Sequence, residues 1–167
     1  NPRTQTMIRH FFLLVGLWLA SSPGVVAQQT NLSREEADQQ IETLWQEACA
    51  PLRASLEKEW KDKAIQVNQL TMKFLVREFG SAPATGRSLF ISMHGGGGAP
   101  TRVNDQQWRN QIRLYEPEEG IVVAPRAPSD NWSLWHEAPI DGLFDRLILA
   151  AVVSANVDPN RVYLMGY

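Results

Sequence analysis

The sequence predicts an α/β domain in which a mostly parallel sheet is flanked by helices. Short apolar runs that favour buried strands alternate with longer amphipathic stretches, and brief turns connect them. A glycine-rich stretch, HGGGG, directly follows one of these predicted strands. Four successive glycines lose much conformational entropy on folding, which indicates that the backbone of this loop has a task of its own.

The composition is that of a globular protein with one core. The chain has 167 residues, of which 44% are hydrophobic and 20% are charged. A formal net charge of −2 provides no basic surface, so we expect no nucleic-acid partner. Cys49 is the only cysteine, and it excludes an internal disulfide bond. For an exported protein, this favours a bacterial periplasm or exterior.

Residues 1–27 are predicted to comprise upstream residues and a secretory signal peptide. A basic start precedes the apolar run Phe11–Ala20, and the breaker SSPG and the small residues Val25 and Ala27 follow it. The run is shorter than the roughly 20 residues that cross a bilayer core of about 30 Å. We therefore expect a secreted or periplasmic bacterial protein with no stable membrane span after cleavage. A buried N-terminal helix is the alternative.

Residues 28–68 are predicted to form a helical N-terminal extension. Ser33 and Glu36 have the S-x-x-E spacing of a capping box, and apolar residues at helical spacing continue towards Pro51. A second helical stretch, RASLEKEWKDKA, is so heavily charged that we expect it to be solvated. Nothing in these residues indicates what the extension contacts.

Beyond residue 69 the pattern alternates between strands and helices. TMKFLVREF, SLFISM, GIVVAP and RVYLMG are predicted strands. NDQQWRNQIRLY is a predicted helix with Asn104 as its N-cap, and GLFDRLILAAVV is a second amphipathic helix. Helices between successive strands predict a parallel sheet covered on both faces, with the last strand near its middle.

The glycine loop has three candidate chemistries, of which two do not fit. A dinucleotide-binding G-x-G-x-x-G would need its third glycine at Pro100 or Thr101, and no Gly-Lys-Ser/Thr follows for a phosphate loop. An oxyanion hole fits, because bare backbone N–H groups stabilise the negative charge that develops during ester hydrolysis.

Since no metal-ligand spacing such as H-E-x-x-H occurs, we expect no metal, with a metal site at His94 and His136 as the minor alternative.

Three motifs together resemble the α/β-hydrolase superfamily, in particular secreted esterases of the polyhydroxybutyrate-depolymerase and feruloyl-esterase kind. They are SLFISMHGGGGAP, VAPRAPSDNWSLWHE and DPNRVYLMGY. The resemblance implies that residues 69–167 form the N-terminal half of an α/β-hydrolase domain. Gly166 and Tyr167 match the first two positions of the G-x-S-x-G nucleophile elbow. The domain is therefore expected to be truncated just after the strand that leads to this elbow.

The resemblance also implies roles for individual residues. Gly96 and Gly97 are the expected backbone donors of the oxyanion hole, and Tyr167 is the elbow residue before the nucleophile. His94 is expected at the substrate site as the residue that positions the glycine loop. In this fold the catalytic acid and base follow the nucleophile, so neither His94 nor His136 is expected to be the base.

Trp132 and Trp135 are candidate substrate-binding residues. They lie in the loop that follows a predicted parallel strand, where ligands bind in α/β sheets, and they suit an acyl or aromatic group. A role in capping the core is an equal alternative. Asp130 and Glu137 in the same loop either contact substrate or are solvated or turn-capping residues.

The leading functional hypothesis is a secreted serine hydrolase that acts on carboxylic esters through an acyl-enzyme, without a cofactor. The ester could be polymeric or aromatic. The chain as given is expected to be inactive, because the triad residues are expected beyond it. The alternatives are a non-catalytic exported binding protein on a hydrolase scaffold and a peptidase of the same fold. Serine after Tyr167 would favour the enzyme.

Overall fold

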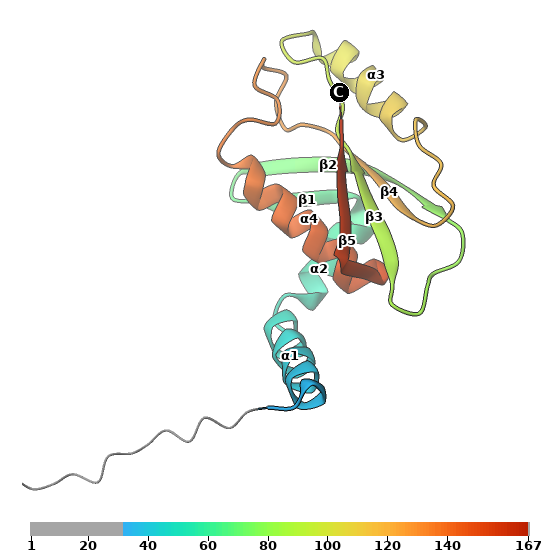
Figure 1. The fold of residues 1–167 in the computed structure, drawn as a ribbon. Helices are drawn as coiled ribbons and strands as arrows, with labels where there is room; N and C mark the ends of the chain where they lie inside the picture. Colours follow the sequence, from blue (N-terminus) through green and yellow to red (C-terminus); the bar gives the residue numbers. More distant parts are fainter. Residues whose placement is uncertain (1–31, 167) are drawn as a thin grey trace, which may run out of the picture.

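The computed structural model describes residues 32–166, so the predicted signal peptide and Tyr167 lie outside the described residues. Four helices and five strands follow one another along this part of the chain (Figure 1). Their order is α1 (Arg34–Cys49), α2 (Arg53–Asp62), β1 (Ala64–Val67), β2 (Leu70–Phe79), β3 (Arg87–Ser92), α3 (Thr101–Gln111), β4 (Gly120–Pro125), α4 (Ile140–Ala155) and β5 (Val157–Met165).

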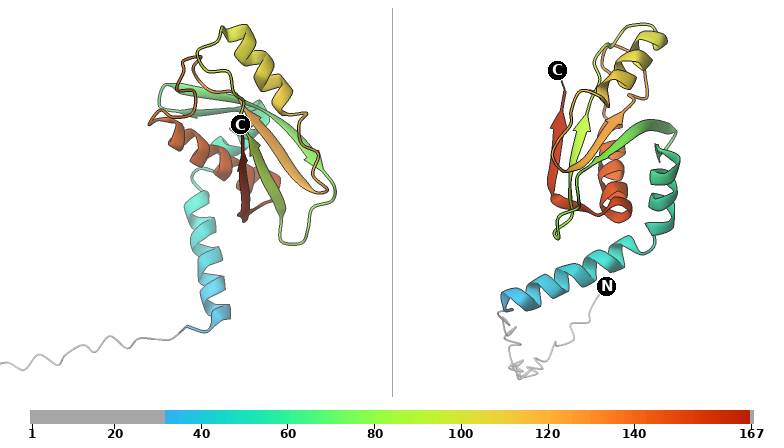
Figure 2. Two further views of the ribbon diagram at one scale, coloured as in Figure 1. Left: turned by 45° about the horizontal axis from the view of Figure 1, so that its top comes forward. Right: turned by 90° about the vertical axis from the view of Figure 1, so that its right-hand side faces the viewer.

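The five strands form one sheet in the order β1-β2-β4-β3-β5. Strand β3 pairs in parallel with β4 and with β5, whereas β2 is antiparallel to both β1 and β4. The predicted fold class, a mostly parallel α/β-hydrolase sheet, is therefore wrong. The sheet is mixed and curled, and four helices accompany it (Figures 1 and 2).

Short connections explain the antiparallel pairs. Only two residues join β1 to β2, and the first of them, Asn68, has a left-handed φ of 54°. Such a loop makes a hairpin, which is antiparallel by construction. The connection from β2 to β3, residues 80–86, is also too short to hold a crossover helix, so the chain reverses direction there. Strand periodicity identified most of the strands but carries no information on their relative directions.

Helices cover both faces of the sheet, as expected. Strand β4 is buried along its whole length. Its successive side chains point to opposite faces of the sheet, so they pack alternately in two different cores. Ile121 and Val123 pack in the larger core, which includes apolar residues of α2 and α4. Val122 and Ala124 pack in a smaller core with Trp108 of α3. The sheet thus separates α3 from the α2 and α4 pair.

Helix α1 begins with the predicted capping box. The Ser33 hydroxyl accepts the Glu36 N–H at 3.2 Å, and the Glu36 carboxylate accepts the Ser33 N–H at 2.8 Å. The helix extends away from the sheet and leaves Ile41 and Leu44 exposed (Figure 2). Within residues 32–166, no helix is both long enough and apolar enough to cross a membrane.

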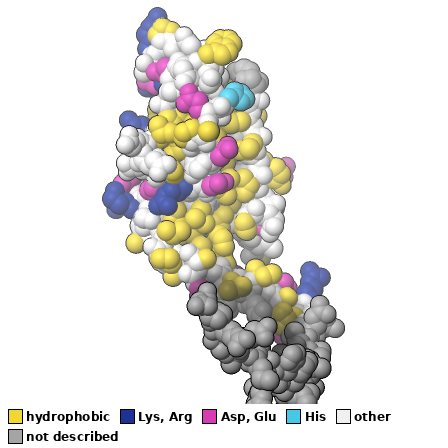
Figure 3. Space-filling view, turned by 90° about the vertical axis from the view of Figure 1, so that its left-hand side faces the viewer, with side chains coloured by type: hydrophobic (Ala, Val, Ile, Leu, Met, Phe, Trp, Pro, Cys, Tyr) yellow, Lys and Arg dark blue, Asp and Glu magenta, His cyan; other side chains and the backbone are white. Residues whose placement is uncertain are grey.

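Helix α2 is not the solvated helix that its charges predicted. Leu56 and Trp60, four residues apart on one face, are buried in the larger core beside α4. Arg146 also connects helix α4 to helix α2, because its Nε donates to Glu59 at 2.8 Å. Hydrophobic side chains also remain visible among charged ones on the side of the molecule shown in Figure 3.

Three further details differ from the sequence prediction. Asn104 is not an N-cap: α3 begins at Thr101, and Asn104 lies inside its first turn, fully buried. Strand β1 was not predicted, and the boundary at residues 68 and 69 falls between β1 and β2. Strand β5 begins at Val157, before the predicted strand RVYLMG, because the preceding residues are already extended.

Replacing a core leucine tests the packing of α4 on the sheet. Leu147→Ala should lower the free energy of unfolding by about 2–5 kcal/mol, because Leu147 is completely buried and its loss leaves a cavity. Leu44→Ala is the control, since Leu44 is 63% exposed and should change stability by less than about 0.5 kcal/mol. Urea denaturation measures both, and similar losses in the two variants would contradict this assignment of the core.

Candidate functional site

The site lies where the carboxyl ends of the three parallel strands meet. The glycine loop, residues 93–100, follows β3, and the aromatic loop, residues 126–139, follows β4. With Gly166 after β5 they line an open cavity of about 350 Å³. It is lined by Met93, His94, Gly95, Trp132, Ser133, Leu134, Trp135, His136 and Gly166. A neighbouring cavity of about 320 Å³ is lined by Gly96, Gly97 and Trp132.

A larger hollow of about 460 Å³ elsewhere does not have the properties of a site. The described residues that line it all belong to the exposed helix α1, so no groups from different elements converge there. Among residues 32–166, no three His, Cys, Asp or Glu side chains gather closely enough to hold a metal ion. The two cavities at the glycine loop are therefore the candidate site.

His94 connects the loops beneath this site. Its ring is 1% exposed, its Nδ1 lies 2.8 Å from the Gly95 carbonyl oxygen, and its Nε2 accepts the Ala127 N–H at 3.1 Å. These partners assign a neutral ring with the proton on Nδ1. Burial lowers the pKa of His94 further and keeps the ring neutral. Both ring nitrogens are used inside the protein, so His94 acts on the loop as a positioning residue.

Gly96 and Gly97 need to be glycines for different reasons. Gly96 has a φ of 105°, and a Cβ there would lie 2.6 Å from the side-chain oxygen of Asn104. At Gly97 a Cβ would lie 2.8 Å from the Trp132 carbonyl oxygen and 2.9 Å from that of Asn131. The backbone of the aromatic loop therefore lies directly against the glycine loop.

The glycine loop presents several unused hydrogen-bond donors. The N–H groups of Gly95, Gly96 and Gly97 have no acceptor in the part of the chain that the structure describes. The loop turns back immediately afterwards, where Gly98 N–H donates to the Asp130 carbonyl at 3.0 Å. Successive free N–H groups beside a cavity can stabilise a negatively charged oxygen. The two predicted oxyanion donors, Gly96 and Gly97, are both among them.

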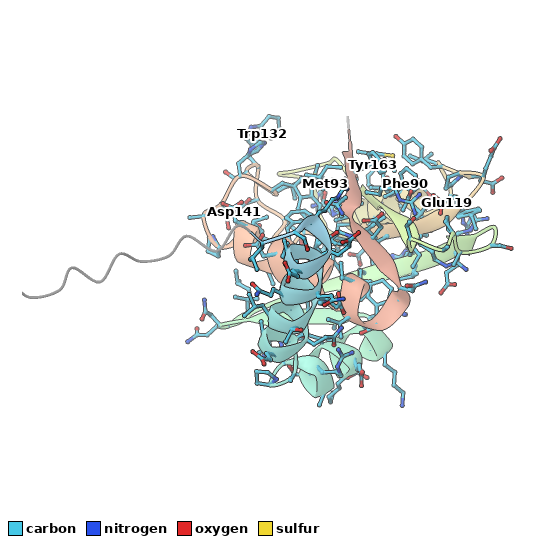
Figure 4. The ribbon with its side chains drawn as sticks, turned by 60° about the horizontal axis from the view of Figure 1, so that its bottom comes forward. Phe90, Met93, Glu119, Trp132, Asp141 and Tyr163 are labelled. Atoms are coloured by element: carbon cyan, nitrogen blue, oxygen red, sulfur yellow. The ribbon has the colours of Figure 1, made fainter. Side chains whose placement is uncertain are left out.

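The two tryptophans have different environments. Trp132 is 85% exposed and lies in the middle of the aromatic loop, where it projects from the rest of the structure (Figure 4). It lines both cavities. Trp135 is half-buried; its Nε1 donates to the His94 carbonyl at 2.9 Å, and its ring packs against His94 and Phe144. Trp132 is thus free to contact a ligand, while Trp135 fixes the aromatic loop on the structure.

A charged network lies behind the glycine loop, and sequence reasoning did not identify it. The Arg126 guanidinium binds the carboxylates of Asp105 and Asp130, and its side chain is only 11% exposed. Asp130 also accepts hydrogen bonds from Thr101 and Asn104. Hydrogen bonds from Thr101 first and then Arg126 lower the pKa of Asp130 to about 2, so this carboxylate is ionised near neutral pH.

The cavity lining contains two polar side chains that were not predicted as site residues, Ser133 and His136. The two residues belong to one tight turn, in which His136 N–H donates to the Ser133 carbonyl at 2.7 Å. Among the described residues, no serine hydroxyl is hydrogen-bonded to a histidine, and the buried Ser92 accepts from Gln111. No Lys, Arg, Asp or Glu of the described chain lines either cavity.

The structure places the described predicted site residues at the two neighbouring cavities. His94, Trp132 and Trp135 meet at one cavity, and Gly96 and Gly97 line the other, with Trp132 common to both. Tyr167 lies outside the described residues. Comparison of the chain with protein-family models, with curated proteins and with solved structures finds no match.

The protonation of His94 provides a test of its role. Because its pKa is lowered in the folded protein, the unfolded chain binds a proton more readily, so stability should fall as the pH drops below the ordinary value of 6.5. His94→Asn removes this dependence and leaves the Ala127 N–H without its acceptor. The stability lost in the variant should be about 1–3 kcal/mol at pH 7.5 and clearly smaller at about pH 5.5. Urea denaturation at both values measures it; a constant difference would contradict a neutral, buried His94.

Proposed function

We propose that this protein is an exported carboxylic ester hydrolase in which the glycine loop stabilises the oxyanion. The observation that carries the proposal is the run Gly95 to Gly97, whose three N–H groups have no acceptor among the described residues. These glycines line the two neighbouring cavities at the carboxyl ends of the parallel strands. Hydrolysis of an ester passes through a tetrahedral intermediate with a negatively charged oxygen. Preorganised N–H donors aimed at that oxygen lower the barrier by about 3–4 kcal/mol for each donor.

The lining of the site agrees with an uncharged ester substrate. The walls are formed by apolar and aromatic side chains, chiefly Met93, Trp132, Leu134 and Trp135, and by bare glycine backbone. An uncharged acyl or alcohol group gains from burial against such walls, whereas a charged one would lose its hydration without a partner. The site is therefore better suited to uncharged esters than to ionic substrates.

The sequence motifs support the same chemistry. HGGGG lies where an oxyanion loop of secreted esterases would lie, directly after a strand. Gly166 lines the cavity, and Gly166 and Tyr167 match the start of a G-x-S-x-G motif, whose serine would be the nucleophile. In this proposal the serine oxygen attacks the ester carbonyl while a histidine takes the serine proton. The C–O bond to the alcohol then breaks, and the alcohol leaves with the proton from the histidine. Water hydrolyses the resulting acyl-enzyme, which releases the acid and restores the serine. No metal or organic cofactor enters these steps.

A binding protein without catalysis is the second candidate, and the exposure of Trp132 favours it. An indole that is 85% exposed beside two cavities is a ready contact for a ligand even where no bond is broken. A peptidase remains the third candidate, since it would use the same oxyanion stabilisation with an amine as leaving group.

Hydrolysis of p-nitrophenyl acetate and butyrate by the protein expressed from its complete reading frame tests the proposal. Gly96→Ala should lower kcat/KM by about 10²–10³, because the Cβ meets Asn104 and the left-handed φ is lost, which moves the N–H donors. Gly142→Ala is the matched control: it lies in α4, its Cβ would meet nothing closer than 3.6 Å, and kcat/KM should be unchanged.

The outcomes separate the three candidates. Ester hydrolysis that depends on Gly96 but not on Gly142 supports the esterase. No hydrolysis above background by the folded wild-type protein would rule it out and leave the binding protein. Cleavage of p-nitroanilide substrates in preference to the matching esters would indicate a peptidase.

Trp132 should act on substrate binding alone. Trp132→Ala is expected to raise KM for p-nitrophenyl butyrate several-fold with little change in kcat, because it removes a wall and no reacting group. Its exposure means that stability should change by less than about 0.5 kcal/mol. Trp135→Ala, by contrast, should destabilise the protein measurably, since it removes the hydrogen bond to His94 and the contact with Phe144. Equal effects of the two variants on KM would argue against a special role for Trp132.

A further inference from the structure

Asp130 holds three parts of the structure together behind the glycine loop. Its carbonyl oxygen accepts the Gly98 N–H at 3.0 Å, which ties the end of the glycine loop. One carboxylate oxygen accepts the Thr101 hydroxyl at 2.7 Å, and the other accepts the Asn104 side-chain amide at 2.8 Å, both on the first turn of α3. The Arg126 guanidinium, just after β4, binds the same carboxylate.

Asn104 transmits this contact to Gly96. Its side chain is completely buried, and its amide nitrogen donates to Asp130 and to the Ala99 carbonyl at 3.1 Å. Its amide oxygen has no hydrogen-bond partner among the described residues and lies where a Cβ on Gly96 would be 2.6 Å away. The two acceptors around the nitrogen fix which way the amide points. Without the Asp130 carboxylate, the amide loses one of them, and the surface that supports Gly96 changes.

Two carboxylates in this network share the single positive charge of Arg126. Its guanidinium meets two carboxylates, Asp105 and Asp130, at a position where its side chain is 11% exposed. Hydrogen bonds from Thr101 and Arg126 lower the pKa of Asp130 to about 2. The carboxylate is consequently ionised near neutral pH, the state in which it pairs with Arg126.

We propose that Asp130 is a positioning residue for the oxyanion-stabilising glycine loop, acting through Asn104 and Gly98. This inference rests on the proposed function for its kinetic consequence, while its structural consequence can be measured independently. Asp130 is not among the residues that line the two cavities. Its effect should therefore appear in the rate of the chemical step, because misplaced N–H donors stabilise the transition state less, and hardly in substrate binding.

Asp130→Asn in the protein from the complete reading frame tests the inference. The substitution keeps the size of the side chain but removes the charge. We expect kcat for p-nitrophenyl butyrate to fall about ten- to a hundred-fold while KM changes less than about three-fold. The substitution keeps the carbonyl of residue 130, but the loss of the carboxylate contacts should shift that residue and weaken its bond to Gly98. The exchange rate of the Gly98 amide proton, measured by NMR, should therefore rise, and the amide signals of Gly95–Gly97 should shift.

Glu119→Gln is the matched control. Glu119 also accepts from a serine hydroxyl, that of Ser88 at 2.6 Å, and also pairs with an arginine, Arg161, at 3.2 Å. It lies at the amino ends of β3 and β4, at the opposite end of the sheet from the cavities; Figure 4 labels it together with Trp132. This variant should lose stability without changing kcat or the exchange of the Gly98 amide.

A pair of substitutions at Thr101 distinguishes positioning from a general loss of stability. Thr101→Val removes the hydroxyl that donates to Asp130 and should reduce kcat in part, whereas Thr101→Ser keeps the hydroxyl and should restore it. A fall in kcat for Asp130→Asn no larger than that for Glu119→Gln, or equal effects of Val and Ser at residue 101, would overturn the inference. If the wild-type protein hydrolyses no ester, the proposed function fails, and unchanged Gly98 exchange in Asp130→Asn would separately disprove the positioning role.

Discussion

The arrangement of the candidate site depends on the buried, neutral imidazole of His94. A buried ring with two nitrogens needs a partner for each, and here the partners are the carbonyl of Gly95 and the N–H of Ala127. Its own carbonyl receives the Trp135 indole N–H. One residue at the end of β3 therefore sets the start of the glycine loop, the course of the chain after β4 and the position of the aromatic loop. Because an uncompensated polar group in this position would be costly, the three connections form or fail together.

The backbones of the glycine loop and the aromatic loop approach each other more closely than side chains between them would allow. Gly97 lies against the carbonyl groups of Asn131 and Trp132, and Leu134 of the same loop adopts a left-handed φ of 33° while remaining buried. A leucine in this conformation is strained, and such strain persists only where the surroundings enforce it. The ion pairs of Arg126 and the contacts of Asp130 supply that enforcement from behind. The N–H groups of Gly95 to Gly97 belong to this closely packed glycine loop.

The mixed sheet brings these loops together although it is not the sheet that the sequence predicted. Strands β4, β3 and β5 are parallel neighbours, so their carboxyl ends deliver Pro125, Ser92 and Met165 to one edge, and the loops that follow meet there. The antiparallel strands β1 and β2 extend the sheet on the far side of β4 and complete the core with α2 and α4. The chemistry of the site therefore depends on three strands, and the rest of the fold makes them stable.

The sequence by itself determined the local features of this protein. Period-two and period-3.6 patterns located most elements, the capping box set the start of α1, and the four glycines identified the loop at which the site is found. Only the tertiary structure decided strand direction, the burial of Leu56 and Trp60 on a charged helix, and the hydrogen bond between Asn104 and Asp130. The sequence had predicted Asn104 as a cap, and Asp130 as a residue that contacts substrate, is solvated or caps a turn. The reason is physical: local patterns report the conformation of a segment, whereas pairing direction, burial and charge networks arise between segments that are distant in sequence.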